Sequence, residues 1–346
     1  MAQPEIICLP AVKPLELLGL QSHLLDTVKG GGTAPVLLIF QISGSVISLG
    51  RYHLYSGPAS RCEISAYRRL TGGRIINPGA GWIGCALIAP SRTAMLDERD
   101  NKLRPERVMN RYTRGAMAAL RALGVDCFYP GRDAITSSGR ELAMCTFEED
   151  AAGALLFELF IAVERGLETL PFEMERFDPD GALACRLYDA QTCTCLAREL
   201  GRSPGFDELA GHLEAGYRSL LRGTRRRELT AAEAAAASAP VSKLARGLFG
   251  RQPDPSLSLT GRLGIQLGFI EAHLAPSEER IERIEFYGDF IANSAGLTRF
   301  EQSLAGQRLD LMTLTSVALQ TYGDGSNFIL GCGDLSNLAR LILKAS

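Results

Sequence analysis

RRLTGGR at residues 68–74, which leads into IINPGAGW at residues 75–82, is the stretch that constrains the fold and the function most. Its adjacent glycines, Gly72 and Gly73, allow the backbone to approach a ligand closely and offer N–H groups to an anion. The arginines on either side could form forked hydrogen bonds to a carboxylate or a phosphate. A hairpin turn with solvated arginines fits the composition equally well, so this stretch alone leaves its function open.

The residues around this stretch have the patterns of buried strands and of one amphipathic helix. Apolar runs bounded by glycine or proline predict core strands over residues 35–42, 45–49 and 82–89. Residues 105–123 switch to a helical period and end at Gly124, a typical helix stop. Shorter strand-like pieces follow over residues 126–129, 134–137 and 152–163.

The chain is predicted to become mostly helical from about residue 178. Two clear helices are expected over residues 206–221 and 230–248. After them, residues 257–274 and 281–291 alternate as strands do, and three short helices close the chain, the last over residues 335–343.

A Pro/Gly-rich connection at residues 249–256 predicts a domain boundary. We therefore expect an α/β (α+β) protein with a mixed β-sheet and helices in a catalytic domain over residues 1–248. The connection at residues 249–256 would be a linker, and residues 257–346 would form a small α+β accessory domain.

Composition narrows the class of protein. The chain has 346 residues, 46% of them hydrophobic, and a net charge of −2, which argues against a nucleic-acid partner. No apolar run reaches the length of a membrane span, and the N-terminus lacks the basic region of a signal peptide. Nine scattered cysteines favour a reducing cytoplasm over a disulfide framework, and the four unclustered histidines predict no metal site.

Five segments together resemble the lipoate–protein ligase and octanoyltransferase superfamily, which shares its fold with the biotin–protein ligases. The strongest is RRLTGGR at residues 68–74, preceded by SVISLGRY at residues 45–52. The others are GRDAI with GRELA at residues 131–143, TCLARELG at residues 194–201 and IERIEFYGDF at residues 281–290. The segments follow the order of the family and cover roughly residues 36–344.

The resemblance implies a two-step reaction. Lipoate or octanoate would be joined to ATP, with Mg²⁺, as an acyl-adenylate, and the acyl group would pass to a lysine of a lipoyl-carrier domain. The glycine-cleavage H protein and the E2 component of 2-oxoacid dehydrogenases are such carriers. Arg69 would meet the nucleotide phosphates, and the two glycines would give the acyl tail room. The residues assigned by resemblance to the nucleotide and the adenylate are Arg69, Gly72, Gly73, Arg74, Ile75, Ile76, Asn77 and Asp133.

One departure from the family bears directly on catalysis. The family has a lysine, which holds the substrate carboxylate and the adenylate, where this chain has Glu141. Arg140 is its neighbour, but adjacent side chains of a strand point to opposite faces. None of the five lysines lies between residues 103 and 242. The third glycine of the ligase loop is likewise replaced, here by Arg74, as it often is in octanoyltransferases.

These departures leave three hypotheses. The first is a ligase in which Arg140 or another arginine replaces the lysine. The second is an acyltransferase with Cys127 as its nucleophile, since a thiolate there could accept an acyl group without ATP; a buried apolar role for Cys127 is the alternative. The third is a non-catalytic paralogue that binds lipoate, an acyl-AMP or a lipoyl domain.

Two further features lie outside these motifs. The run Arg225-Arg226-Arg227 is either a solvated cationic helix cap or a docking patch for an acidic carrier domain. His53, close to Arg51, is expected at the surface, with a place at the mouth of the pocket as the alternative.

Overall fold

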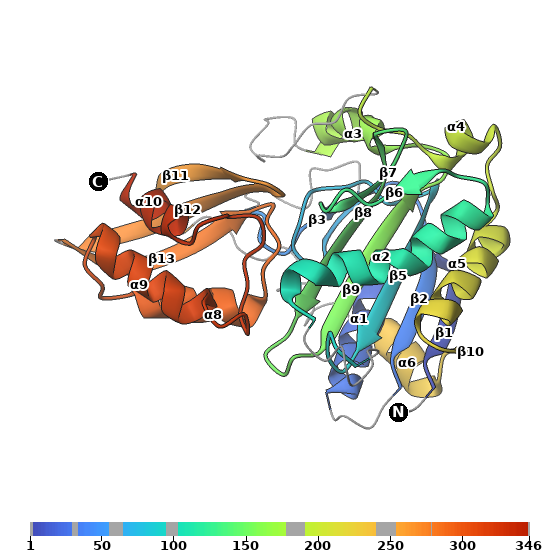
Figure 1. The fold of residues 1–346 in the computed structure, drawn as a ribbon, viewed down its shortest axis with the longest axis horizontal. Coiled ribbons are helices and arrows are strands. Elements are labelled where there is room, and N and C mark those ends of the chain that lie inside the picture. Colours follow the sequence, from blue (N-terminus) through green and yellow to red (C-terminus); the bar gives the residue numbers. More distant parts are fainter. Residues whose placement is uncertain are drawn as a thin grey trace.

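The computed structural model describes residues 3–29, 34–54, 65–94, 103–177, 191–239, 254–277 and 279–344. Its largest element is an eight-stranded mixed sheet in the order β10-β1-β2-β5-β9-β8-β7-β6 (Figure 1). The strands are β1 (Glu5–Val12), β2 (Val36–Ile42), β5 (Trp82–Ala89), β6 (Cys127–Phe128), β7 (Ala134–Ser137), β8 (Arg140–Glu149), β9 (Leu155–Ala162) and β10 (Arg225–Arg226). The expected α/β fold with a mixed sheet is confirmed.

The apolar runs of the sequence form the centre of this sheet. Strands β2, β5, β9 and β8 are antiparallel neighbours, whereas β1 pairs in parallel with both β2 and β10. Every residue of β5 and of β9 is buried, because helices cover both faces of the sheet. A strand buried on both faces reads as a continuous apolar run, which is why these strands were predictable.

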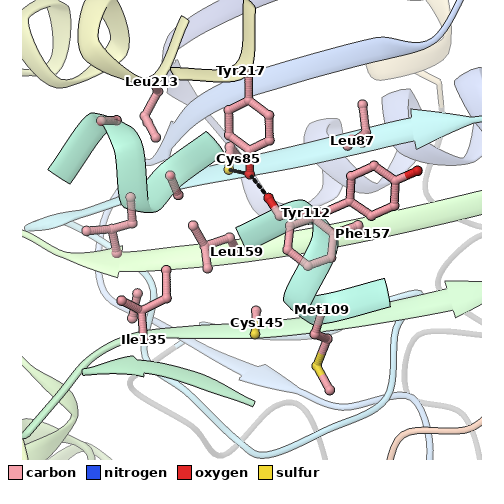
Figure 2. Packing of buried hydrophobic residues seen from close by; sticks show 14 of the residues in the cluster. Cys85, Leu87, Met109, Tyr112, Ile135, Cys145, Phe157, Leu159, Leu213 and Tyr217 are labelled. Carbon is pink, nitrogen blue, oxygen red and sulfur yellow. Dashed lines mark hydrogen bonds between the residues drawn. The ribbon is translucent and has the colours of Figure 1, made fainter. Parts of the chain in front are cut away.

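Helices α2 (Pro105–Ala122) and α5 (Phe206–Leu220) cover the face nearest the viewer in Figure 1. They pack so closely that a Cβ on Gly216 would lie 2.2 Å from the Gly115 carbonyl oxygen, so this contact requires glycine. The Tyr217 hydroxyl donates to the Tyr112 carbonyl at 3.0 Å between the two helices (Figure 2). Both helices agree with the sequence-based prediction to within a residue at each end.

The opposite face is covered by α1 (Pro14–Val28), on which α6 (Ala231–Ala237) packs. A Cβ on Gly19 would lie 2.6 Å from the Ala236 carbonyl oxygen, so glycine allows this contact. The helix predicted over residues 230–248 is described only as α6, and residues 240–248 lie outside the described part. Strand β1 and helix α1 were not predicted.

Smaller elements lie near the end of the sheet where β7 and β8 meet. They are the parallel pair β3 (Val46–Leu49) and β4 (Ser65–Arg68), the short helix η3 (Leu167–Thr169), α3 (Leu170–Phe177) and α4 (Leu196–Leu200). The loop that follows β4 contains the two adjacent glycines.

The C-terminal part forms a second unit with its own apolar core (Figure 1). Its antiparallel sheet consists of β11 (Ser258–Ile265), β12 (Gly268–Ser277) and β13 (Arg280–Gly288). Its helices are α8 (Ser294–Leu304), α9 (Leu311–Tyr322) and α10 (Ser336–Leu343). The two-strand and three-helix prediction for this region is thus extended by one strand. The proposed linker at residues 249–256 lies mostly outside the described residues, so the domain boundary stays a prediction.

Candidate functional site

The loop after β4 is held by the arginines that precede its glycines. Arg68 donates to the carbonyls of Gly50, Arg51 and His53 at 2.6–3.1 Å. Arg69 donates at 2.8–3.0 Å to the carbonyl and hydroxyl of Ser48 and, across the loop, to two carbonyls, those of Gly72 and Arg74. Both side chains are buried. These guanidinium groups fix the shape of the loop.

A buried acid supports the loop from the sheet beneath it. Glu158 of β9 accepts from the Thr71 hydroxyl at 2.5 Å and from the Gln21 amide at 2.8 Å. Its burial raises the pKa of the carboxyl, and the nearby Arg69 guanidinium opposes this rise. Glu158 is the one charged residue in the apolar run 154–163, and that isolated acid was an unused signal in the sequence.

The two glycines contact the C-terminal unit. The Gly73 N–H donates to the Phe290 carbonyl at 2.8 Å, and a Cβ on Gly72 would lie 2.4 Å from the same oxygen. Gly73 has a φ of +87°, which favours glycine. The sequence predicted that the Gly73 N–H could bind an anion, but in this structure it donates to a carbonyl.

Arg74 brings the predicted site residues together. Its Nε lies 2.5 Å from Asp133 Oδ2, and its Nη1 lies 2.9 Å from Glu141 Oε2. The side chains of Arg74 and Asp133 are 1% and 3% exposed, whereas that of Glu141 is 15% exposed. The described members of this cluster are one guanidinium and two carboxylates, and Glu141 is its most exposed member.

Two strands and a loop position Glu141. It is the second residue of β8, and its backbone pairs on the free side with residues 192–194, through hydrogen bonds to Thr192 and Thr194. Its neighbour Arg140 instead pairs with Glu199 at 2.7 Å. Glu141 therefore faces Arg74, and Arg140 does not join the cluster.

The C-terminal unit matches a family model, and the whole chain matches solved structures. Residues 254–324 match the model "Bacterial lipoate protein ligase C-terminus". P. falciparum LipL1, solved in complex with lipoate, is 11% identical and superimposes with a TM-score of 0.67 over 99% of each chain. The fold is that of the lipoate-protein ligases.

Two other solved structures agree with this assignment. A lipoate-protein ligase A bound with ATP is 14% identical, with a TM-score of 0.54 over 68% of this chain and 93% of that one. The bi-partite lipoate protein ligase of Thermoplasma acidophilum, described with its E2 lipoyl domain, is 15% identical, with a TM-score of 0.53 over 72% and 99%. No curated protein matches the sequence. The resemblance stated from the sequence is confirmed for the fold.

Three residues assigned to the adenylate in this ligase fold are buried next to the loop. Ile75 and Ile76 belong to the apolar core between the sheet and α1, and Ile76 exchanges backbone hydrogen bonds with Ser48. The Asn77 amide donates to the Thr169 hydroxyl at 2.7 Å. These contacts do not test nucleotide binding, and neither do those of Arg69, so both assignments stay predictions.

The thiol of Cys127 lies in the core under α2. It is 2% exposed and contacts the Met117 carbonyl at 3.6 Å. Burial raises the pKa of the Cys127 thiol, although the nearby Arg121 guanidinium opposes this rise. A buried thiol of raised pKa is a poor nucleophile, so the structure weighs against the cysteine-transferase hypothesis.

Several acids at the junction with the C-terminal unit were not predicted. Glu148 accepts from the Ser294 N–H at 2.7 Å and from the Tyr52 hydroxyl at 3.4 Å, and burial raises its pKa to about 7. The Tyr52 ring stacks on Phe290 with centroids 4.6 Å apart. Burial also raises the pKa of Asp289 to about 6. The sequence signal was the pair of adjacent acids that ends the apolar strand β8.

One expectation is corrected, and one of two alternatives loses support. His53 is buried, not at the surface; burial and the nearby Arg68 lower its pKa to about 3, so its imidazole is neutral. Arg225 and Arg227 both pair with Glu5, and Arg227 also pairs with Glu233. These ion pairs neutralise most of the triple-arginine run, which therefore does not form a strongly basic docking patch.

Two kinds of feature are absent from the described residues. No group of three or more His, Cys, Asp and Glu side chains there could hold a metal ion. No helix of that part is long and apolar enough to cross a membrane.

Proposed function

We propose that this protein activates lipoate or octanoate with ATP as an acyl-adenylate and transfers the acyl group to a lysine of a lipoyl-carrier domain. The observation that carries the proposal is the buried Arg74 guanidinium beside Gly72 and Gly73 in a lipoate-ligase fold. Arg74 supplies the cation that the family takes from the lysine at the position of Glu141. The positive charge thus lies on the loop after β4, which faces β8, and not on β8 itself.

Each residue of the cluster then has a role in binding. Asp133 holds the Nε edge of Arg74, which orients the guanidinium toward Glu141. The substrate carboxylate enters at the Glu141 end, which is the more exposed end of the cluster, and displaces the Glu141 carboxylate from Arg74 Nη1. A carboxylate oxygen attacks the α-phosphorus and pyrophosphate leaves; the carrier amine then attacks the acyl carbonyl and AMP leaves. The rigid loop keeps Arg74 in place while negative charge develops.

The nucleotide and its metal ion enter as substrates. Mg²⁺ commonly binds through nucleotide phosphates and one or two carboxylates, so it needs no preformed protein cage. The acceptor is a lipoyl domain such as that of E2 or the H protein, in keeping with the E2 lipoyl domain of the T. acidophilum ligase. The seven described cysteines form no disulfide, which suits a cytoplasmic reaction.

A second candidate is a paralogue that binds the acid without activating it. The ion pairs of Arg74 favour this candidate, because the carboxylates of Asp133 and Glu141 already occupy its Nε and Nη1 and a substrate carboxylate would have to compete with them. The hydrogen bond from the Gly73 N–H to Phe290 favours it too, since it removes a donor from the loop.

One set of assays separates the candidates. The purified chain is incubated with octanoate or lipoate, ATP and Mg²⁺, and pyrophosphate exchange is measured; an apo E2 lipoyl domain is then added and acylation is followed by mass spectrometry. Exchange and acylation support the ligase, and binding of the acid without exchange supports the paralogue. Arg74→Gln should abolish exchange, whereas Arg140→Gln should retain most of it. The reverse pattern would return the cationic role to Arg140.

A further inference from the structure

A short segment, residues 192–194, lies beside β8 at the position of Glu141. The Glu141 N–H donates to the Thr192 carbonyl at 2.8 Å, and the Thr194 N–H donates to the Glu141 carbonyl at 2.9 Å. Cys193, between them, forms a parallel bridge with Glu141 and is buried. The backbone of Glu141 is therefore held on this side by residues 192–194, which we call the edge segment.

One carboxylate ties the edge segment to the neighbouring hairpin. Glu199 of α4 accepts from the Thr194 hydroxyl at 2.5 Å and from the Ser137 hydroxyl of β7 at 2.6 Å. It also pairs with Arg140 of β8 at 2.7 Å. Burial alone would raise the pKa of the Glu199 carboxyl, but the two hydroxyls and the guanidinium hold this pKa below its ordinary value. Glu199 is thus ionised at neutral pH and joins the edge segment to β7 and β8.

The chemistry of these donors matches a carboxylate at position 199. Thr194 and Ser137 are 0% and 2% exposed, and buried hydroxyls need a hydrogen-bond partner. A carboxylate accepts at both of its oxygens and also neutralises Arg140. Thr194 and Glu199 both belong to the stretch TCLARELG at residues 194–201, so this contact gives that stretch a role that the sequence left open.

The position of Glu141 matters because its carboxylate occupies Arg74. Its Oε2 lies 2.9 Å from Arg74 Nη1, at the more exposed end of the cluster. Asp133 holds the Nε edge of Arg74 at 2.5 Å, independently of Glu141. Release of Glu141 therefore opens one nitrogen of the guanidinium, while the contact with Asp133 keeps the group in place.

We propose that Glu199 is a positioning residue: through the edge segment it holds Glu141 on Arg74 and so sets the affinity of the site for a carboxylic acid. The inference rests on the proposed function, in which the acid displaces Glu141. The acid binds only those molecules in which Arg74 Nη1 is released, so its apparent Kd rises as that fraction falls. A looser edge segment should therefore tighten binding of the acid, whereas a purely structural role predicts weaker binding.

The test compares two substitutions at one position. Thr194→Val removes the hydroxyl that reaches Glu199 at nearly constant volume, and Thr194→Ser keeps a hydroxyl and serves as the matched control. Glu199→Ala removes all three contacts and should act in the same direction as Thr194→Val. Circular dichroism and thermal melting establish that each variant is folded, and the Thr194 pair decides the matter if Glu199→Ala does not fold.

The first readout is the reactivity of Cys193, which needs no ligand. Burial raises the pKa of this thiol to about 11, so the closed edge segment protects it. Each protein is treated with N-ethylmaleimide, and labelling of each cysteine is followed by peptide mass spectrometry. Thr194→Val should label Cys193 about tenfold faster or more, and Thr194→Ser at about the wild-type rate, because the opening is local. Unchanged labelling of Cys193 in Thr194→Val, or faster labelling of the core residue Cys85 as well, would overturn the inference.

The second readout is the Kd for octanoate, measured by titration calorimetry. Thr194→Val should lower this Kd about threefold or more, and Thr194→Ser should leave it unchanged. An unchanged or raised Kd in Thr194→Val would overturn the inference.

These readouts separate the inference from the proposed function. If the wild type binds octanoate but shows no pyrophosphate exchange, the ligase proposal fails and the Kd comparison still decides the role of Glu199. If no protein of the set binds octanoate, the proposed function fails and so does the link to affinity, while the labelling of Cys193 still decides whether Glu199 holds the edge segment.

Discussion

The pairing of Arg74 with Glu141 predicts that the two residues can be exchanged only together. By the resemblance of the sequence to the ligases, Arg74 takes the place of a loop glycine and Glu141 that of a lysine, and the two side chains meet at 2.9 Å. Restoring the lysine alone, by Glu141→Lys, therefore places an ammonium beside a guanidinium. Restoring both, by Arg74→Gly with Glu141→Lys, leaves a single cation next to Asp133.

The structure gives the size of each effect. An ammonium in place of the Glu141 carboxylate would lie about 4 Å from Arg74, where two unit charges repel by about 4 kcal/mol at an effective dielectric constant of about 20. Attraction to Asp133 offsets part of this, so Glu141→Lys should lower the free energy of unfolding by about 2–4 kcal/mol. Arg74→Gly leaves the buried Asp133 without its cation, at a cost of about 3–5 kcal/mol. The double variant should lose at least about 2 kcal/mol less than the sum of the two.

The assay is urea unfolding of the wild type, both single variants and the double variant, followed by pyrophosphate exchange with octanoate. We expect the double variant to exchange faster than Glu141→Lys, because only the double variant has a cation that is not opposed by a second one. Additive losses of stability would show that the two side chains do not interact. Faster exchange in Glu141→Lys alone would refute the transfer of the cationic role to Arg74.

Three more predictions follow from the buried groups. The pKa of Glu148 is raised to about 7 from 4.5, so its contribution to stability is complete below pH 4.5 and is lost as the pH rises to 7. In urea unfolding between pH 4.5 and 8, the free energy of unfolding of Glu148→Gln should therefore decline by about 2–3 kcal/mol less than that of the wild type. Cys127→Ala should leave carrier acylation unchanged, and loss of acylation without loss of folding would instead support a thiol nucleophile. Gly72→Ala should destabilise the protein by about 1–3 kcal/mol in a thermal melt, because its Cβ meets the Phe290 carbonyl. The exposed helix residue Gly211 has open space around it, and Gly211→Ala as the control should stabilise slightly.

The sequence predicts those parts of the fold that depend on local pattern. Strands β2, β5 and β9 are continuous apolar runs, and α2 and α5 have helical periodicity, so each was found from its own residues. Strand β1 was missed because it begins with the charged Glu5 and Pro10 interrupts its apolar residues. It becomes a strand through its partners on both sides, which no local pattern reveals.

The sequence named the three members of the Arg74 cluster as site residues, but it did not predict that they pair with one another. Arg74, Asp133 and Glu141 were all named from the resemblance, yet 67 residues separate Arg74 from Glu141 in the chain. The ion pair exists because the loop after β4 faces the β7–β8 hairpin, and that juxtaposition is a property of the sheet. For the same reason the support of Thr71 by Glu158, 87 residues away, could not be deduced.

The geometry of the Arg74 cluster requires an arginine and not a lysine at position 74. Arg74 uses Nε for Asp133 and Nη1 for Glu141, two nitrogens on different edges of one rigid plane. A lysine carries one ammonium on a flexible stem and cannot fix two carboxylates in that fork. Arg74→Lys should therefore keep the charge but lose the geometry. Its pyrophosphate exchange should fall as in Arg74→Gln, while its stability falls less; exchange at the wild-type rate would show that the site needs only a positive charge.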